Sequence, residues 1–116
     1  MGEAMNILHK GLAAGRWFGM PFAQQMANIG SEVNRAVNWR DKGDEDLSRK
    51  VLMRALELID MSVLSLKQYP GLKELLRVRE LLVDFFHGFN KFSLSVLFWK
   101  KYFGHFNYLS RKHCLW

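Results

Sequence analysis

Residues 21–67 read PFAQQMANIGSEVNRAVNWRDKGDEDLSRKVLMRALELIDMSVLSLK, and their pattern is that of two amphipathic helices joined by a tight turn. In the first half, apolar residues recur every three or four positions, which is the spacing of one buried helix face. Pro21 suits the start of this helix, where an N–H group has no partner to lose. Gly43 suits a left-handed helix end and Asp44 suits an N-cap, so residues 41–44 predict a helix hairpin.

The second helix of this hairpin extends to about residue 67, and its apolar face is wide enough for a central position in the fold. Two more helices follow the hairpin. The tripeptide Tyr-Pro-Gly at 69–71 then breaks the chain, and apolar residues recur at helical spacing to about His87. A last helix begins after Ser93 or Ser95, each of which suits an N-cap. Its apolar line comprises Trp99, Tyr102, Phe103, Phe106 and Leu109.

These helices predict the fold class. Connections of a few residues between helices of similar length favour antiparallel neighbours. Nowhere does a run rich in β-branched residues alternate apolar and polar positions as a strand would. We therefore predict an all-α fold, an up-and-down four-helix bundle, with a short extra N-terminal helix at residues 3–14 as an option. The whole chain, 1–116, is expected to form a single domain in which residues 1–18 are loosely held.

The composition, 49% apolar and 24% charged residues, is that of a globular protein rather than a disordered one. The lone Cys114 cannot form an internal disulfide, which fits a reducing compartment. The first 14 residues lack an apolar run long enough for a signal peptide. No stretch reaches the roughly 18 apolar residues that a membrane span needs. The expected location is therefore the cytoplasm.

The segment 85–116 concentrates aromatic and basic residues: it holds eleven of the sixteen aromatic residues and no carboxylate side chain. Most of its aromatics lie on one helical line, so we predict that they complete the core. The basic side is predicted to be a solvated face, and contact with nucleic acid, an anionic membrane surface or an acidic partner is the alternative. This basic surface comprises Lys100, Lys101, His105, Arg111 and Lys112.

Arg79 lies on the apolar line of the third helix, where a buried guanidinium needs a carboxylate partner. We predict a contact with Glu32, beside the apolar stripe of the first helix. An equally weighted interpretation leaves the arginine stem over the core and its head in water. A ligand-binding pair is the third interpretation. The predicted polar network comprises Glu32, Arg35, Trp39, Arg79, Glu80 and Asp84.

Motifs for catalysis or metal binding are weak. Asp84 and His87 form one Asp-x-x-His pair, whereas di-metal bundles need such a motif on two helices and a carboxylate from each of the other two. Glu57, Asp60 and His105 are the only further ligands that come into question. Phosphate-binding glycine loops, dinucleotide fingerprints and HExxH are absent from the sequence. We predict no metal, cofactor or catalytic residue, and a non-enzymatic protein is the favoured interpretation.

Several short motifs are similar to those of a group of short prokaryotic proteins of unknown function. They are Asn28-Ile29-Gly30-Ser31-Glu32-Val33, Arg54-Ala55-Leu56-Glu57-Leu58, Arg77-Val78-Arg79-Glu80 and Lys101-Tyr102-Phe103, and the similarity covers roughly residues 24–111. The resemblance implies a compact helical bundle and carries no activity, cofactor or catalytic residue. The chain departs from the group after Gly88, where Phe89 replaces an expected acidic residue.

Together these observations predict a small helical binding or assembly module. A homodimer is expected to form through surplus apolar surface, and another protein is the other partner class. The first alternative is a nucleic-acid-associated protein, whose binding would weaken steeply with salt. The second is a small-ligand binder or enzyme built around the polar network. The residues expected at the dimer surface are Trp17, Phe18, Phe89, Phe92 and Trp116.

Overall fold

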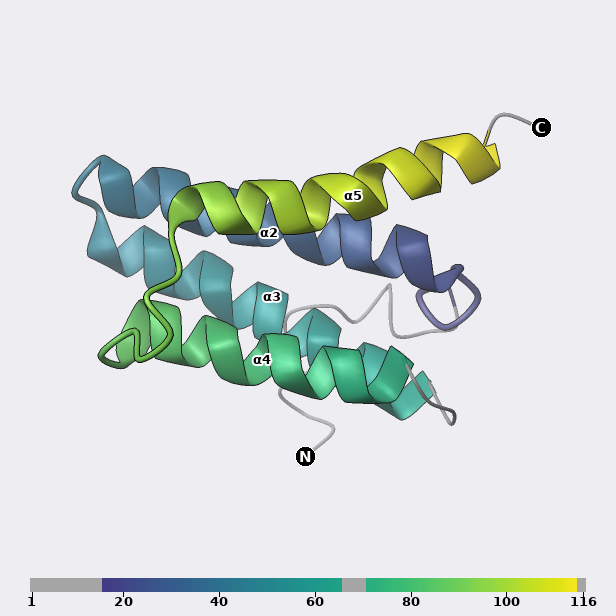
Figure 1. Cartoon of the computed structure of the whole chain (residues 1–116), viewed down its shortest axis with the longest axis horizontal. Helices are drawn as coiled ribbons and strands as arrows, with labels where there is room; N and C mark the ends of the chain where they lie inside the picture. Colours follow the sequence, from purple (N-terminus) through teal and green to yellow (C-terminus); the bar gives the residue numbers. More distant parts are fainter. Residues whose placement is uncertain (1–15, 66–70, 115–116) are drawn as a thin grey trace.

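The computed structural model describes residues 16–65 and 71–114, with side chains over 16–64 and 71–111. This part of the chain forms four helices and no strand (Figure 1). The all-α, four-helix prediction is therefore confirmed, while the optional helix at 3–14 lies outside the described residues. The helices are α2 (Phe22–Asp41), α3 (Glu45–Ser65), α4 (Gly71–His87) and α5 (Val96–Cys114).

The ends of the helices follow the local chemistry of the sequence. Pro21 is the N-cap of α2, one position earlier than its expected place in the first turn. Gly43 has a positive φ of 85°, which suits a residue without a side chain. The Asp44 Oδ1 atom accepts a hydrogen bond of 3.1 Å from the backbone N–H of Leu47 and so caps α3. Ser95 caps α5 in the same way, with its Oγ 3.1 Å from the N–H donor of Phe98.

The connection between α4 and α5 is closed by one asparagine. The Asn90 side chain accepts a hydrogen bond from the N–H of Leu94 at 3.0 Å and donates one to the Leu94 carbonyl at 2.8 Å. Asn90 and Ser93 both have positive φ, 53° and 52°, which makes the turn compact. Phe89 remains 98% exposed at its tip. The apolar stretch after Gly88 is therefore a hydrogen-bonded turn in this structure.

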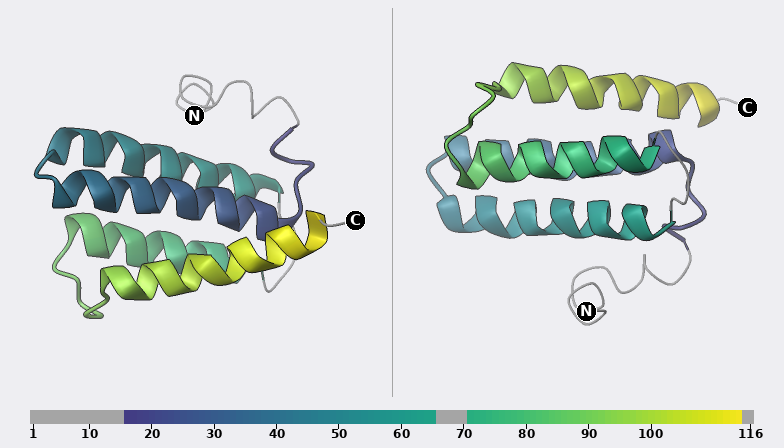
Figure 2. Two further views of the ribbon diagram at one scale, coloured as in Figure 1. Left: turned by 90° about the horizontal axis from the view of Figure 1, so that it is seen from above. Right: turned by 60° about the horizontal axis from the view of Figure 1, so that its bottom comes forward.

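Helix packing leaves one side of the bundle open. α2 packs against both α3 and α5, and α3 packs against α4, while α4 and α5 make no comparable backbone contact. The closely packed pairs are thus α4 with α3, α3 with α2, and α2 with α5, and the left view of Figure 2 shows α4 and α5 on the same side of the bundle. The tight connection at 88–95 joins α4 to α5 on this open side.

The core lies between the four helices and is built from the predicted apolar lines. Met26, Ile29 and Val33 of α2 are at most 1% exposed. On α5, Trp99, Phe103 and Phe106 are buried, and Tyr102 and Leu109 are half-buried, so the predicted aromatic line does complete the core. Edge-to-face pairs such as Phe22 with Phe106, at a centroid distance of 5.9 Å, stabilise this packing.

Trp17 departs from its prediction. The sequence pattern assigns it to a loosely held segment with surface to spare, but it is only 1% exposed and belongs to the core. Its Nε1 donates a hydrogen bond of 3.0 Å to Ser62 Oγ of α3, and its carbonyl accepts one from the Gln25 side chain at 3.0 Å. These bonds satisfy the indole N–H and the backbone carbonyl of a tryptophan that sequence spacing could not assign to any helix face. Trp17 is therefore an anchor of the fold.

Gly30 lies at a close approach of α2 and α5. A Cβ atom at this position would lie 2.5 Å from the Cβ of Phe103 and 2.7 Å from its Cγ. Both distances are shorter than van der Waals contact, so only glycine allows this crossing. Gly104 on α5 differs, because a Cβ atom added there would meet no atom of the described residues within 4 Å.

Candidate functional site

The predicted polar network is divided between two sides of the bundle. The Arg79 guanidinium binds Asp60 of α3, with Nε 2.7 Å from Oδ1 and Nη2 3.2 Å from Oδ2. The predicted contact between Arg79 and Glu32 is therefore wrong. Because the backbone of α4 approaches α3 more closely than α2, the carboxylate within reach is on α3. Glu32 instead pairs with Arg35 one turn along α2, at 3.6 Å.

The Arg79–Asp60 ion pair is bidentate but only partly shielded from water. The two side chains are 38% and 47% exposed, so solvent screens their attraction. The hydrogen bond to Asp60 raises the pKa of Arg79, which is charged at any ordinary pH. The observed contact combines the two main interpretations of the sequence, since the head is paired and also reaches solvent. It fastens α4 to α3.

The other network residues do not join this pair. Trp39 packs against a separate small cluster of Ala36, Val51 and Leu52, with the ammonium of Lys42 5.0 Å from the centre of its ring. Glu80 is exposed on α4. Asp84 is half-buried near the end of the same helix, and its Oδ2 is buried without a hydrogen-bond partner among the described residues. The six residues therefore do not form one polar site.

The candidate metal ligands also remain scattered. Within residues 16–65 and 71–114, no three His, Cys, Asp or Glu side chains group closely enough to hold a metal ion. In the same residues no helix has the length and hydrophobicity to cross a bilayer.

Glu57, which the sequence offered only as one of several weak candidate metal ligands, is a buried carboxyl on α3, 6% exposed. Burial raises its pKa above the ordinary value, and the nearby charge of Asp60 raises it further. The Glu57 carboxyl therefore binds its proton more tightly in the folded protein than in the unfolded chain. The contribution of Glu57 to stability is greatest at low pH and declines as the pH rises from 4.5 through the raised pKa.

Replacing Glu57 with glutamine is expected to remove this decline, because glutamine keeps the shape and carries no titrating charge. Urea unfolding between pH 4 and pH 8 should give a flatter dependence of the unfolding free energy than wild type gives. The exposed Glu80→Gln variant is the matched control and should keep the wild-type slope. An unchanged slope in Glu57→Gln would contradict the assignment.

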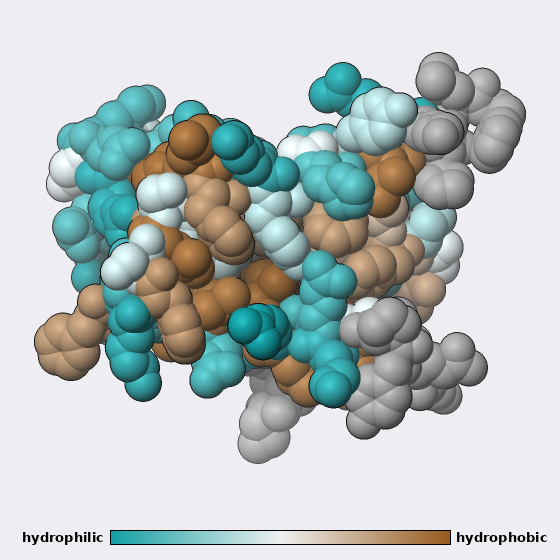
Figure 3. Space-filling model, viewed as in Figure 1, coloured by the Kyte–Doolittle hydropathy of each residue, from teal (hydrophilic) through white to brown (hydrophobic). Residues whose placement is uncertain are grey.

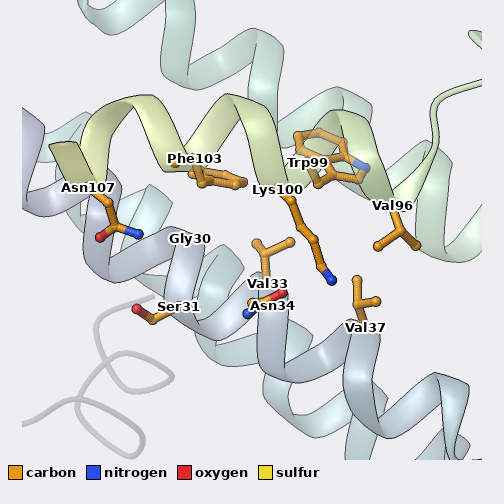
Figure 4. A pocket seen from close by; sticks show the side chains of 11 residues that line it. Gly30, Ser31, Val33, Asn34, Val37, Val96, Trp99, Lys100, Phe103 and Asn107 are labelled. Atoms are coloured by element: carbon orange, nitrogen blue, oxygen red, sulfur yellow. The ribbon is translucent and has the colours of Figure 1, made fainter.

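The predicted basic surface is exposed but does not form one face. Lys100, Lys101, His105 and Arg111 are all exposed on α5, and the side chain of Lys112 lies outside the described residues. Successive helix positions differ by about 100° around the axis, so Lys100 and Lys101 point in different directions. In Figure 4 the Lys100 side chain extends from α5 toward α2, between Asn34 and Val37. It borders a pocket of about 120 Å³ between α2 and α5.

A larger hollow lies between α4 and α5, on the open side of the bundle. This groove has a volume of about 610 Å³. Its lining is mostly apolar, and Figure 3 shows apolar side chains exposed in the hollow between the two helices. Charged residues of both signs border it on α4. The apolar lining comprises Leu76, Val78, Leu81, Phe98, Trp99 and Tyr102, and the charged border comprises Lys73, Glu74, Arg77 and Glu80.

Two polar features lie in this groove. The Tyr102 hydroxyl donates a short hydrogen bond of 2.6 Å to Glu74 Oε2, which ties α5 to α4. Burial and this bond to Glu74 raise the pKa of Tyr102, so the phenol stays protonated. The Nε1 atom of Trp99 is buried without a hydrogen-bond partner in the described part of the chain. Helical spacing predicts which residues face inward but not how far apart two helices lie, so the sequence pattern gave no sign of the groove.

Comparison of the chain with protein-family models, with curated proteins and with solved structures found no match. The resemblance to a group of short prokaryotic proteins therefore stays a prediction, and the groove and the surfaces around it are the features that bear on function.

Proposed function

We propose that the chain is a small, non-enzymatic helical binding module whose working surface is the groove between α4 and α5. The observation that supports this proposal is the open apolar hollow of about 610 Å³ between two helices that other helices do not separate. Leu76 is 50% exposed and Phe98 is 37% exposed at its walls. Exposure of these apolar side chains to water is unfavourable, so a partner that covers them gains the free energy of removing them from water.

The shape and chemistry of the groove favour a polypeptide occupant. An apolar floor bordered by charges of both signs suits an amphipathic helix, which places its apolar face in the groove and its polar residues at the rim. Small-molecule sites, in contrast, usually enclose most of their ligand and direct several polar groups at it. In this groove the acceptor of Glu74 is already bonded to Tyr102.

A photo-reactive residue placed at the groove tests this function. With p-benzoylphenylalanine at position 76, irradiation of cells that express the protein should give a discrete cross-linked band. Met53 on α3 is 53% exposed and lies outside the groove, so the same residue at position 53 is the matched control. A substitution of Phe98 with glutamate should abolish the band from position 76. Equal cross-linking from both positions would contradict a specific docking groove.

One observation favours nucleic-acid association as a second candidate. α5 carries no Asp or Glu, and its residues Lys101, His105 and Tyr108 are exposed, with Tyr108 at 64%. Cations neutralise phosphates and an exposed ring stacks on a base. We place this function second because Lys100 lies along the α2–α5 pocket, away from Lys101. A site built on the polar network comes third, because Arg79 and Glu32 have different partners.

A further inference from the structure

Four charged residues of α4 are spaced symmetrically about the midpoint of the helix, and their charges change sign across that midpoint. Lys73, Arg77, Glu80 and Asp84 follow one another at spacings of four, three and four residues, and their signs are plus, plus, minus, minus. These spacings keep all four on one stripe of the helix. A second copy of the helix, laid antiparallel on this stripe, places Lys73 opposite Asp84 and Arg77 opposite Glu80. The same two pairs recur on the other side of the two-fold axis, so four opposite charges meet four.

Three of the four residues of the stripe are accessible at the border of the groove. Lys73, Arg77 and Glu80 are exposed and line the groove, and Asp84 is half-buried at the end of the stripe. Among the described residues, Arg77 and Glu80 make no ion pair within the chain. The buried Oδ2 of Asp84 has no hydrogen-bond partner there either. Arg77 and Glu80, at the middle of the stripe, can therefore form ion pairs with another molecule.

The same antiparallel pairing of two α4 helices would also cover apolar side chains beside the charged stripe. Leu76, 50% exposed, and the half-buried Leu81 flank the charged stripe and line the groove. Positions 76 and 81 lie about 140° apart around the helix, one on each flank of the stripe. Under a two-fold axis between Val78 and Arg79, Leu76 therefore lies on the same flank as Leu76 of the second copy, and Leu81 on the same flank as Leu81 of the copy. Phe98 on α5 forms the opposite wall. An antiparallel pair therefore matches charge with charge and apolar surface with apolar surface.

We propose that the occupant that covers the groove is a second copy of this chain, with α4 antiparallel to α4 of the copy. This inference rests on the proposed function of the groove as a docking surface. A two-fold interface uses the same patch on both subunits, so the patch must complement itself. The charged stripe of α4 has this property, because its two halves carry opposite charges. A partner of different sequence would not require it. Because the contact follows one helix of 17 residues, about 25 Å long, the dimer should be weak, with a Kd in the micromolar range.

Charge exchange tests the antiparallel register. By sedimentation equilibrium, wild type should show a concentration-dependent dimer. Arg77→Glu and Glu80→Arg should each weaken it by about tenfold or more, since like charges then face each other twice. The double variant Arg77→Glu/Glu80→Arg restores opposite charges at both pairs and should dimerise like wild type. A one-to-one mixture of the two single variants should form a heterodimer with the wild-type Kd, although each variant alone dimerises more weakly. Both residues are exposed, so all variants should keep the wild-type circular dichroism spectrum.

Two outcomes would overturn the inference. One is a wild-type protein that stays monomeric at several hundred micromolar; the other is a dimer that single and double variants form equally well. The cross-linking at position 76 then separates the two proposals. A band of heterologous mass from a monomeric protein would retain the groove as a docking surface and reject the self-pairing. Monomer without any groove-specific band would reject both.

Discussion

Replacing Trp17 with alanine should lower the free energy of unfolding by about 3–5 kcal/mol, the usual range for removing a buried tryptophan side chain. The indole is 1% exposed and packs in the main core. Its removal would leave a cavity and would also end the hydrogen bond from Nε1 to Ser62. Chemical unfolding in urea, followed by circular dichroism at 222 nm, measures the loss.

The neighbouring Phe18 gives the control for this substitution. Phe18 is 43% exposed, so Phe18→Ala removes an aromatic ring from the same segment with much less loss of buried surface. We expect a change of less than about 1 kcal/mol for this variant. Equal losses from the two variants would mean that the segment before α2 is not anchored by Trp17. A loss limited to Trp17→Ala would establish residues 16–21 as part of the folded unit.

Replacing Gly30 with alanine should destabilise the protein by about 3 kcal/mol, at the upper end of the usual cost of overpacking. The new methyl group would overlap Phe103 Cβ and Cγ, at 2.5 Å and 2.7 Å. The Cβ atom is fixed by the backbone and does not move when the side chain rotates, so α5 must move away from α2. The close helix crossing and the aromatic packing around Phe103 would both suffer.

Gly104→Ala is the matched variant, because Gly104 also lies within a helix and faces open space. Alanine there should stabilise the protein by about 1 kcal/mol, the difference in helix propensity between the two residues. The two glycine substitutions are thus expected to have opposite signs in the same urea unfolding measurement. Stabilisation by Gly30→Ala would show that α2 and α5 can separate without cost.

Local chemistry explains the parts of the fold that the sequence predicted well. Gly43 with Asp44 defined the turn between α2 and α3, and a serine was expected to cap α5. Such features depend on residues within one turn of each other, so a linear pattern contains them. Helical spacing likewise identified the buried line of α5, including Trp99 and Phe103.

Features that depend on distances between helices were beyond the sequence pattern. The partner of Arg79 depended on whether α4 lies closer to α3 or to α2, and spacing within one helix does not contain that information. The groove exists because α4 and α5 remain apart, which is a property of the whole bundle. Trp17 precedes α2, so it had no periodic neighbours to mark it as buried. One signal was available: Gly30 in the middle of a predicted helix indicates close backbone approach.

The crossing of α2 and α5 also constrains how this protein can change over evolutionary time. Positions 30 and 103 share one space, since the Cβ and Cγ atoms of Phe103 occupy the volume that any side chain at 30 would need. Because every residue except glycine has a Cβ atom, a side chain at 30 is tolerated only if glycine takes position 103 or the two helices move apart. The two positions, separated by most of the chain, should therefore be inherited as a pair, and relatives of this protein are expected to vary them jointly.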